Sequence, residues 1–249
     1  MMRLLSVTLL RDKVTDWSVY PFIVPAIRTL EKLEIRSRIC FLVGENGSGK
    51  STLLEAIAES YGFGREGGSR SFYRETTETL GGVTPLSRAL RIAFSKRTGQ
   101  GFYLRAESFF NVATEIDRIG VSDAYGAVSL HQRSHGESFL ALLENRFGRK
   151  GFYVLDEPEA ALSPQRQITM LTVLRNLLAD NQEIQFLIAT HSPILLAYPE
   201  AQILSFDDGV IHEISYRETP AYQVMARFVA RPEVYVREVL EQGSDHRED

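Results

Sequence analysis

The residues best suited to chemistry in this chain form a glycine-rich run, residues 44–51, which reads Gly-Glu-Asn-Gly-Ser-Gly-Lys-Ser. The run matches the pattern G-x-x-x-x-G-K-[S/T] at every fixed position. Its glycines allow several backbone N–H groups to face one anion, and a helix after the loop adds the positive end of its dipole. The run therefore predicts a site for a nucleotide phosphate chain. The expected binding residues are Gly44, Glu45, Asn46, Gly47, Ser48, Gly49, Lys50, Ser51 and Thr52.

Two carboxylates follow an apolar run at residues 152–155. If that run is a strand of a parallel sheet, its end lies at the ligand crevice. Asp156 is suited to hold Mg²⁺ together with the Ser51 hydroxyl, and Lys50 to reach the β- and γ-phosphates. Glu157 is suited to polarise an attacking water. Two acids at a strand end are by themselves typical of a solvated turn, and the phosphate loop is what favours the catalytic interpretation.

Two shorter motifs accompany the acids. Residues 134–138, Ser-His-Gly-Glu-Ser, precede them and open a helical pattern, so that Ser134 and the N–H groups from Gly136 onward predict a second anion site. Ser-x-Gly-Glu alone is also an ordinary helix start. Residues 190–193, Thr-His-Ser-Pro, follow the next apolar run and supply His191.

The order and spacing of these motifs resemble those of ABC-type ATPases. Residues 134–138 are similar to the family signature, although His135 replaces the first glycine of its usual Ser-Gly-Gly start. Residues 160–163 lie where the family has its D-loop, and His191 matches the switch histidine. The resemblance covers most of the chain and is closest to soluble stand-alone ABC-like ATPases, often described as AAA-type, which are related to SMC and recombination-repair ATPases.

The resemblance implies hydrolysis of ATP with Mg²⁺ and a homodimer that forms on ATP binding. Lys50, Glu157 and His191 would be the catalytic residues. Ser134 and Gly136 would face the γ-phosphate held by a second copy of the chain.

Three further positions are compared with the family pattern. No glutamine directly follows the expected strand at residues 101–105, so Glu107 is predicted as the nearest substitute at the metal. Tyr20 or Phe22 could stack on the base, and the alternative is packing in the core or at a sheet edge. No heptad insertion separates Glu107 from Ser134, so the coiled-coil arm of SMC proteins is not expected.

Alternating strand and helix patterns predict an α/β fold. We expect a P-loop NTPase of the ABC-ATPase type, with a mostly parallel central sheet, N-terminal antiparallel strands and a small helical subdomain. Residues 1–249 would form one domain, with a helical signature lobe at about 84–147 and a helical tail at 216–249. Strands are expected at residues 4–10, 20–24, 38–43, 101–105, 152–155 and 184–189, with a hairpin of 202–206 and 210–214. Helices are expected at residues 51–61, 108–119, 136–147, 164–179, 221–229 and 233–240, with a helical turn or two at 26–33.

The amino-acid composition limits where in the cell the protein is expected and which partners it is expected to bind. The 249 residues are 44% hydrophobic and carry a formal net charge of −4, which is not the overall charge of a DNA-binding domain. The single cysteine, Cys40, lies in an apolar run and is expected to be buried, in a reducing compartment. No run approaches the roughly 18 apolar residues of a membrane span, and the first residues lack the features of a signal peptide. We therefore expect a cytoplasmic protein without direct membrane insertion.

Three roles for the ATPase stay open. The first is nucleic-acid maintenance or defence, which is favoured by a locally basic segment that could contact phosphates. The alternative interpretation is that these basic residues simply lie on a solvated loop and helix face. The second is the ATPase subunit of a membrane transporter. The third is a nucleotide-gated switch with little turnover that regulates an effector protein, for which the tail helices could be the partner surface or could pack on the core. The basic residues are Arg65, Arg70, Arg74, Arg88, Arg91, Lys96 and Arg97.

Overall fold

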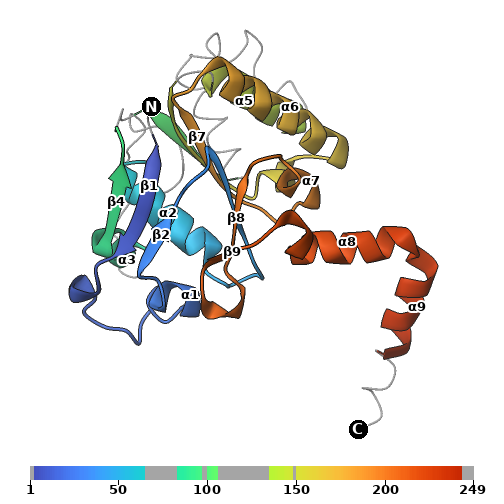
Figure 1. Ribbon diagram of the computed structural model, residues 1–249, viewed down its shortest axis with the longest axis horizontal. Coiled ribbons are helices and arrows are strands. Elements are labelled where there is room, and N and C mark those ends of the chain that lie inside the picture. The colour runs from blue at the N-terminus through green and yellow to red at the C-terminus, as the bar shows by residue number, and fades with distance from the viewer. Residues whose placement is uncertain (1–2, 65–82, 97–99, 106–134, 148–149, 243–249) are drawn as a thin grey trace.

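The computed structural model describes residues 3–64, 83–96, 100–105, 135–147 and 150–242. Within these ranges the chain forms two sheets with helices around them (Figure 1). The larger sheet has six strands in the order β5-β6-β7-β3-β8-β9, all parallel except the last pair. Its strands are β3 (Ile39–Val43), β5 (Gly101–Arg105), β6 (Gly151–Asp156), β7 (Ile184–Ala189), β8 (Gln202–Ser205) and β9 (His212–Glu213).

The parallel strands are buried on both faces, which explains their continuous apolar sequences. In β3, Cys40 and Leu42 enter one hydrophobic core, whereas Ile39, Phe41 and Val43 enter the other. The first core is shared with α2 (Lys50–Tyr61) and the smaller sheet, and the second with α5 (His135–Arg146) and α6 (Pro164–Asp180). The sheet therefore lies between two covering layers. The ends of its strands are where the candidate site lies.

The smaller sheet is antiparallel, with the order β2-β1-β4. Its strands are β1 (Leu4–Leu9), β2 (Lys32–Glu34) and β4 (Leu90–Phe94). The expected N-terminal antiparallel strands are thus confirmed, but β2 and β4 were not predicted. β2 is only three residues long and β4 alternates buried or half-buried with exposed residues, so neither shows a long apolar run.

A buried glutamine joins the two sheets. Gln185 of β7 is fully buried, and its side-chain oxygen accepts a hydrogen bond from the Leu4 N–H at 2.6 Å. Its side-chain nitrogen donates to the carbonyls of Leu4 and Ser37, both at 3.2 Å. The side-chain amide thus binds the backbone of β1 much as a neighbouring strand would, and all its polar atoms are satisfied inside the core.

The expected strand at residues 20–24 is wrong. This segment forms a turn that leads into α1 (Pro25–Arg28). Pro21, joined to Tyr20 by a cis peptide bond, has no N–H to give to a sheet, and Pro25 provides a favourable first residue for the helix. The strong β propensity of the aromatic and branched residues in between is therefore overridden by the two prolines.

The predicted helical lobe, residues 84–147, begins with elements of the two sheets. α3 (Thr84–Ala89) packs on α2, β4 joins the smaller sheet and β5 the larger one. The first part of that range is therefore not a separate helical unit. The predicted helix at residues 108–119 lies outside the described residues, and α5 forms as predicted.

The C-terminal part continues from the predicted hairpin, β8 with β9, to two helices, α8 (Pro220–Ala230) and α9 (Pro232–Gln242). They project from the body of the molecule (Figure 1). The alternative expectation, packing of these helices on the core, is therefore wrong for most of their length: no residue of α8 is buried. No helix in the described ranges is long and apolar enough to span a membrane. The remaining elements are α7 (Pro193–Leu196), η1 (Arg11–Lys13), η5 (Pro158–Ala161), η6 (Asp207–Gly209) and η7 (Tyr216–Glu218).

Candidate nucleotide site

The phosphate loop joins the end of β3 to the start of α2, as its sequence predicts. Gly44, Gly47 and Gly49 have φ angles of 144°, 80° and 106°, a region that L side chains rarely adopt. A Cβ atom at Gly49 would lie 2.8 Å from Val24 Cγ1, so the loop is also packed closely against the turn before α1. The loop conformation therefore favours glycine at all three positions, and the close surroundings of Gly44 and Gly49 also leave no room for a side chain.

Lys50 is folded into the loop. Its side chain is 4% exposed, and Nζ donates hydrogen bonds to the carbonyl oxygens of Gly44 at 2.6 Å and Glu45 at 2.9 Å. Burial lowers the pKa of this ammonium group, and the nearby carboxylates of Glu157, Asp207, Asp156 and Glu45 counteract that effect. The ammonium group is thus held at the mouth of the loop by hydrogen bonds to two carbonyl oxygens. A phosphate oxygen could take the place of either carbonyl as the acceptor.

Ser51 and Asp156 meet, although they are far apart in the chain. The Ser51 hydroxyl donates to Asp156 Oδ1 at 3.0 Å. Asp156 ends β6 and is 6% exposed, so that burial raises its pKa to about 6, against the opposing effects of the Ser51 hydrogen bond and of Arg105. A hydroxyl and a carboxylate oxygen at this separation suit a hard cation such as Mg²⁺.

Arg105 is part of this corner, although the sequence motifs do not single it out. Its Nε lies 3.5 Å from Asp156 Oδ2, and Nη1 lies 3.4 Å from Glu55 Oε2. The signal that could have found it is its position: Arg105 is the last residue of β5 and pairs in register with Asp156 of β6. Parallel strands place such terminal residues side by side.

Glu157 and His191 come together at the strand ends. His191 Nε2 lies 3.8 Å from Glu157 Oε1, and both side chains are about half exposed. Glu157 has a left-handed backbone conformation, with φ of 51°, while its N–H donates to the Ala189 carbonyl at 2.9 Å. A non-glycine residue held in this region is strained, and such residues cluster at functional sites.

Glu159 holds the histidine turn, residues 190–193, through two hydrogen bonds. Its Oε1 accepts the His191 backbone N–H at 2.6 Å, and its Oε2 accepts the Thr190 hydroxyl at 2.8 Å. Sequence reasoning missed this residue, because an acid in a solvated 3-10 turn is common. Its one signal is the spacing, two residues after Glu157 and directly before the D-loop segment.

The side chain of Gln167, in α6, forms hydrogen bonds to both the D-loop segment and the turn that carries His191. Its side-chain nitrogen donates to the Leu162 carbonyl at 3.1 Å, and its oxygen accepts the Ser192 hydroxyl at 2.6 Å. Ser192 in turn accepts hydrogen bonds from the N–H groups of Ile194 and Leu195 and so caps α7. The predicted D-loop segment and the turn that carries His191 are therefore tied to one helix.

Asp207 is the fourth residue that the motifs do not indicate. Its Oδ1 accepts the backbone N–H of Glu45, the second residue of the phosphate loop, at 2.8 Å. The Ser205 hydroxyl donates to its Oδ2 at 3.3 Å. Because β8 lies beside β3, the turn that follows β8 and carries Asp207 is placed against the start of the loop.

The start of α5 contacts the D-loop segment. A Cβ at Gly136 would lie 2.6 Å from the Arg166 side chain and 3.2 Å from the Ala161 carbonyl, and Arg166 also forms an ion pair with Glu137 at 2.9 Å. Gly136 is thus at a helix start, as predicted. Ser134 and Glu107 lie outside the described residues.

Of the two candidates for base stacking, Phe22 packs in the core. It is 3% exposed and its ring contacts Trp17 edge to face, so the alternative interpretation holds for this residue. Tyr20 is 46% exposed, and its hydroxyl lies 3.2 Å from Thr52 Oγ1 at the end of the loop. Tyr20 therefore stays the candidate for the base.

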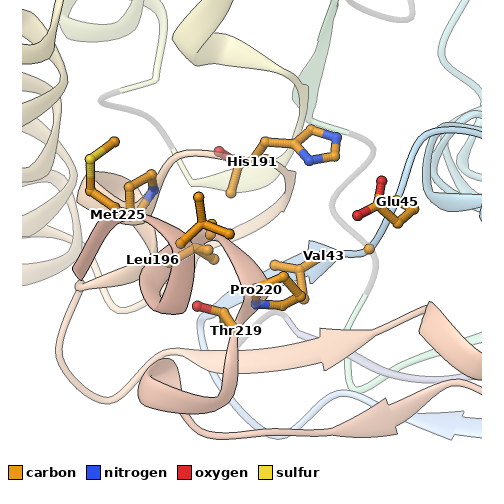
Figure 2. Close-up of a pocket in the computed structure, with 12 residues that line it drawn as sticks. Val43, Glu45, His191, Leu196, Thr219, Pro220 and Met225 are labelled. Carbon is orange, nitrogen blue, oxygen red and sulfur yellow. The ribbon is translucent and has the colours of Figure 1, made fainter. Parts of the chain in front are cut away.

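A pocket of about 330 Å³ lies beside the loop (Figure 2). Glu45 and His191 are on one side of it, and Thr219, Pro220 and Met225, at the start of α8, are on another. Val43, Pro193, Leu196, Ala221 and Val224 make most of its lining apolar. The pocket thus connects the histidine turn to the C-terminal helices.

Comparisons with known proteins match the chain to ATPases and ATP-binding proteins. Residues 107–196 match the family described as AAA ATPase domain. The chain is 29% identical over 216 residues to a putative 2-aminoethylphosphonate import ATP-binding protein PhnT of Salmonella choleraesuis, which covers 79% of this chain and 54% of that protein. It is also 29% identical over 191 residues to the thiamine import ATP-binding protein ThiQ of a Chelativorans species, covering 70% and 75%. The chain spans little more than half the length of the PhnT relatives.

Two solved structures are similar at lower identity. The SMC head domain of Thermotoga maritima has 17% identity and a TM-score of 0.46, with 86% of this chain and 98% of that chain covered. The cbiO1 subunit of the transporter complex cbiONQ of Clostridium perfringens has 18% identity and a TM-score of 0.48, with 84% and 91% covered.

The phosphate loop, the two strand-end acids and the histidine turn lie on a mostly parallel sheet. In this arrangement, and in its matches to an AAA ATPase domain and to import ATP-binding proteins, the chain is similar to P-loop ATPases of the ABC type.

Proposed function

We propose that this chain binds and hydrolyses ATP at a site completed by a second copy of itself, and that hydrolysis releases the dimer. The observation that carries the proposal is the meeting of three separate segments at one sheet edge: Lys50 and Ser51, Asp156 and Glu157, and His191. The sheet order places the ends of β3, β6 and β7 side by side.

The donor set fits a magnesium ion shared with the substrate. Ser51 and Asp156 offer hydroxyl and carboxylate oxygens, but no group of three or more His, Cys, Asp or Glu in the described ranges could hold a metal alone. Mg²⁺ commonly uses one or two protein ligands together with substrate phosphates. When bound, the ion would neutralise charge that develops on the phosphoryl oxygens. Glu107, the third predicted ligand, stays a prediction.

The remaining roles follow from positions around this corner. Lys50 exchanges its carbonyl partners for phosphate oxygens, while the loop N–H groups hold the same phosphates. Glu157 orients a water molecule and accepts its proton as the water attacks in line with the leaving oxygen. His191 lies beside Glu157, where it can contact the γ-phosphate and the same water. Glu159 and Gln167 position the histidine turn and touch neither substrate nor water.

The second copy supplies the other anion site. Gly136 is the second residue of α5, and the positive end of the helix dipole at this helix start suits a phosphate oxygen. We propose that Gly136 and Ser134 of one copy face the γ-phosphate bound by the other, in a two-fold symmetric dimer with two sites.

For the wider role we propose a cytoplasmic ATPase in nucleic-acid maintenance or defence. Its support is limited to exposed basic residues, of which Arg88, Arg91 and Lys96 are described. The names of the relatives favour an alternative, the ATPase subunit of an importer. Salt-sensitive DNA binding that is lost on replacing Arg88 and Arg91 by Glu supports the first role, whereas co-fractionation with membranes of the host supports the second. A regulatory switch for an effector protein would show ATP binding with little turnover.

The test of the proposed reaction is ATP turnover per subunit, measured over a wide range of protein concentrations. We expect the rate per subunit to rise steeply with concentration and to vanish in Glu157→Gln, because the site needs two copies and a general base. The matched control is Glu31→Gln, which neutralises an exposed carboxylate before β2 and should leave the rate unchanged. A Glu157→Gln variant with wild-type turnover contradicts the assigned base, and a rate per subunit independent of concentration contradicts the shared site.

A further inference from the structure

The helices α8 and α9, residues 220–242, form an arm that carries many exposed apolar side chains. Val229 is 68% exposed and Val239 is 55% exposed, although valine is a residue that usually lies inside proteins. The exposed apolar residues of the arm include Val224, Met225, Phe228, Val229, Val234, Val236 and Val239. So many exposed apolar side chains on adjoining helices are unusual for a protein surface, and they mark an interaction site.

The exposed residues are arranged by the helical repeat. Val224, Phe228 and their neighbours Met225 and Val229 are spaced four apart and so share one face of α8. At the bend between the helices, the rings of Phe228 and Tyr235 meet nearly at right angles, with centroids 6.1 Å apart. This contact holds α9 to α8, so the arm is a defined unit.

The arm begins at the nucleotide site. Thr219, which is fully buried, accepts the N–H of Tyr222 at 3.3 Å and thereby caps the start of α8. The same residue lines the pocket that also contains Glu45 and His191 (Figure 2). The apolar face therefore continues directly from the edge of the molecule that the proposed dimer uses.

We propose that the arm packs against the arm of a second copy of this chain, as an apolar contact continuous with the nucleotide-bound interface. The claim that the arm contact is continuous with a nucleotide-bound interface rests on the proposed function. Three arginines and three glutamates balance the charge of the arm, so two arms do not repel each other. A membrane-binding helix would instead carry an excess of Lys and Arg on its polar face.

The total exposed apolar area of the arm agrees with a contact that is weak alone. Together with Leu240, which is 67% exposed, these side chains expose on the order of 700 Å², which is below the roughly 800 Å² that each partner buries in a standard interface. The arms should therefore associate weakly without nucleotide, and ATP should strengthen the association by adding the second contact.

The experiment compares sedimentation velocity of the full chain with and without ATP and Mg²⁺, in a Glu157→Gln background that retains the nucleotide. The arm variant is Val229→Glu with Val239→Glu, which places charges at exposed positions and removes no core residue. The control is Val210→Glu, a valine that is 50% exposed near the β8–β9 hairpin, outside the arm. Binding of a fluorescent ATP analogue and circular dichroism check each variant.

We expect the arm variant to abolish association without nucleotide and to raise the concentration needed for the ATP-bound dimer at least tenfold. The control should behave like the parent, and ATP binding per subunit should be equal in all three. An arm variant that associates like the parent overturns the proposal, as does flotation of the parent with anionic vesicles in place of self-association. If ATP fails to strengthen association while the arm-dependent contact persists, the shared nucleotide site is wrong and the arm contact stands.

Discussion

The carboxylate of Asp207 accepts a hydrogen bond from the backbone N–H of Glu45, so the turn after β8 holds the entrance of the phosphate loop. The two are 162 positions apart in the chain. The contact exists because β8 and β3 are neighbours in the sheet, and it keeps one N–H of the loop engaged when no phosphate is present.

Replacing Asp207 should therefore weaken nucleotide binding. In Asp207→Ala the Glu45 N–H loses its partner and the loop entrance loosens, which we expect to lower ATP affinity about 5- to 10-fold, on the order of 1 kcal/mol. Equilibrium titration with a fluorescent ATP analogue measures it. The neighbouring Asp208→Asn is the control, since Asn tolerates the left-handed backbone of that residue and no loop contact is removed. Unchanged affinity in Asp207→Ala would show that the loop keeps its shape unaided.

Glu159 should affect turnover more than binding. Glu159→Ala removes the acceptor of both the His191 N–H and the Thr190 hydroxyl, so the histidine turn loses its fixed position. We expect kcat to fall tenfold or more while the affinity for ATP changes less than twofold.

Steady-state kinetics separates the two effects, and Glu159→Gln provides the graded comparison. The glutamine keeps one acceptor oxygen and should retain intermediate turnover. Equal losses of kcat and of affinity in the alanine variant would indicate a general disturbance of the site instead.

The sequence predicted the phosphate loop and the acids because their spacing along the chain carries the information. It also predicted most strands, because strands buried on both faces read as apolar runs. Arg105, Asp207 and Gln167 could not be found in this way. Each acts through a neighbour that only the strand order or the packing of α6 brings close, and a single arginine, aspartate or glutamine at a strand end or on a helix is an ordinary surface residue.

Asp156 should make the stability of the metal-free chain depend on pH. Burial raises its pKa from the ordinary 3.8 to about 6, so between these values the folded chain binds more protons than the unfolded chain. The free energy of unfolding should therefore fall as pH rises from about 4 to about 6, by up to ~3 kcal/mol, and change no further above that range.

Urea denaturation with EDTA at pH 4.5, 5.5 and 7 tests this in wild type and Asp156→Asn. The difference between the two isolates Asp156 from carboxylates whose pKa is lowered, such as Glu218, which act in the opposite direction. A difference that stays constant with pH would mean that the buried carboxyl titrates normally.

Cys40 should be inert to thiol reagents in the folded protein. It is the second residue of β3 and has no exposed surface, and burial raises the pKa of its thiol well above the usual range. Because the thiolate is the reactive form, we expect no reaction with a disulfide reagent at pH 8 within an hour, and complete reaction after unfolding in urea. Absorbance of the released thiolate measures it, with Cys40→Ser as the blank. Rapid reaction in native buffer would reveal frequent opening of the central sheet.

The place of β3 in the sheet also constrains how the protein is made. Its two neighbours, β7 and β8, are both synthesised much later, as is Gln185, which fastens β1 to the sheet. On the ribosome β3 therefore has no neighbouring strand in the larger sheet until β7 has emerged, and the phosphate loop lacks the strand on its other side until β8 has emerged. Closure of such distant contacts is slow, and the early apolar strands stay exposed meanwhile. A chain that terminates before β8 should be recognised by chaperones and proteases as unfolded, long before it could hold a nucleotide.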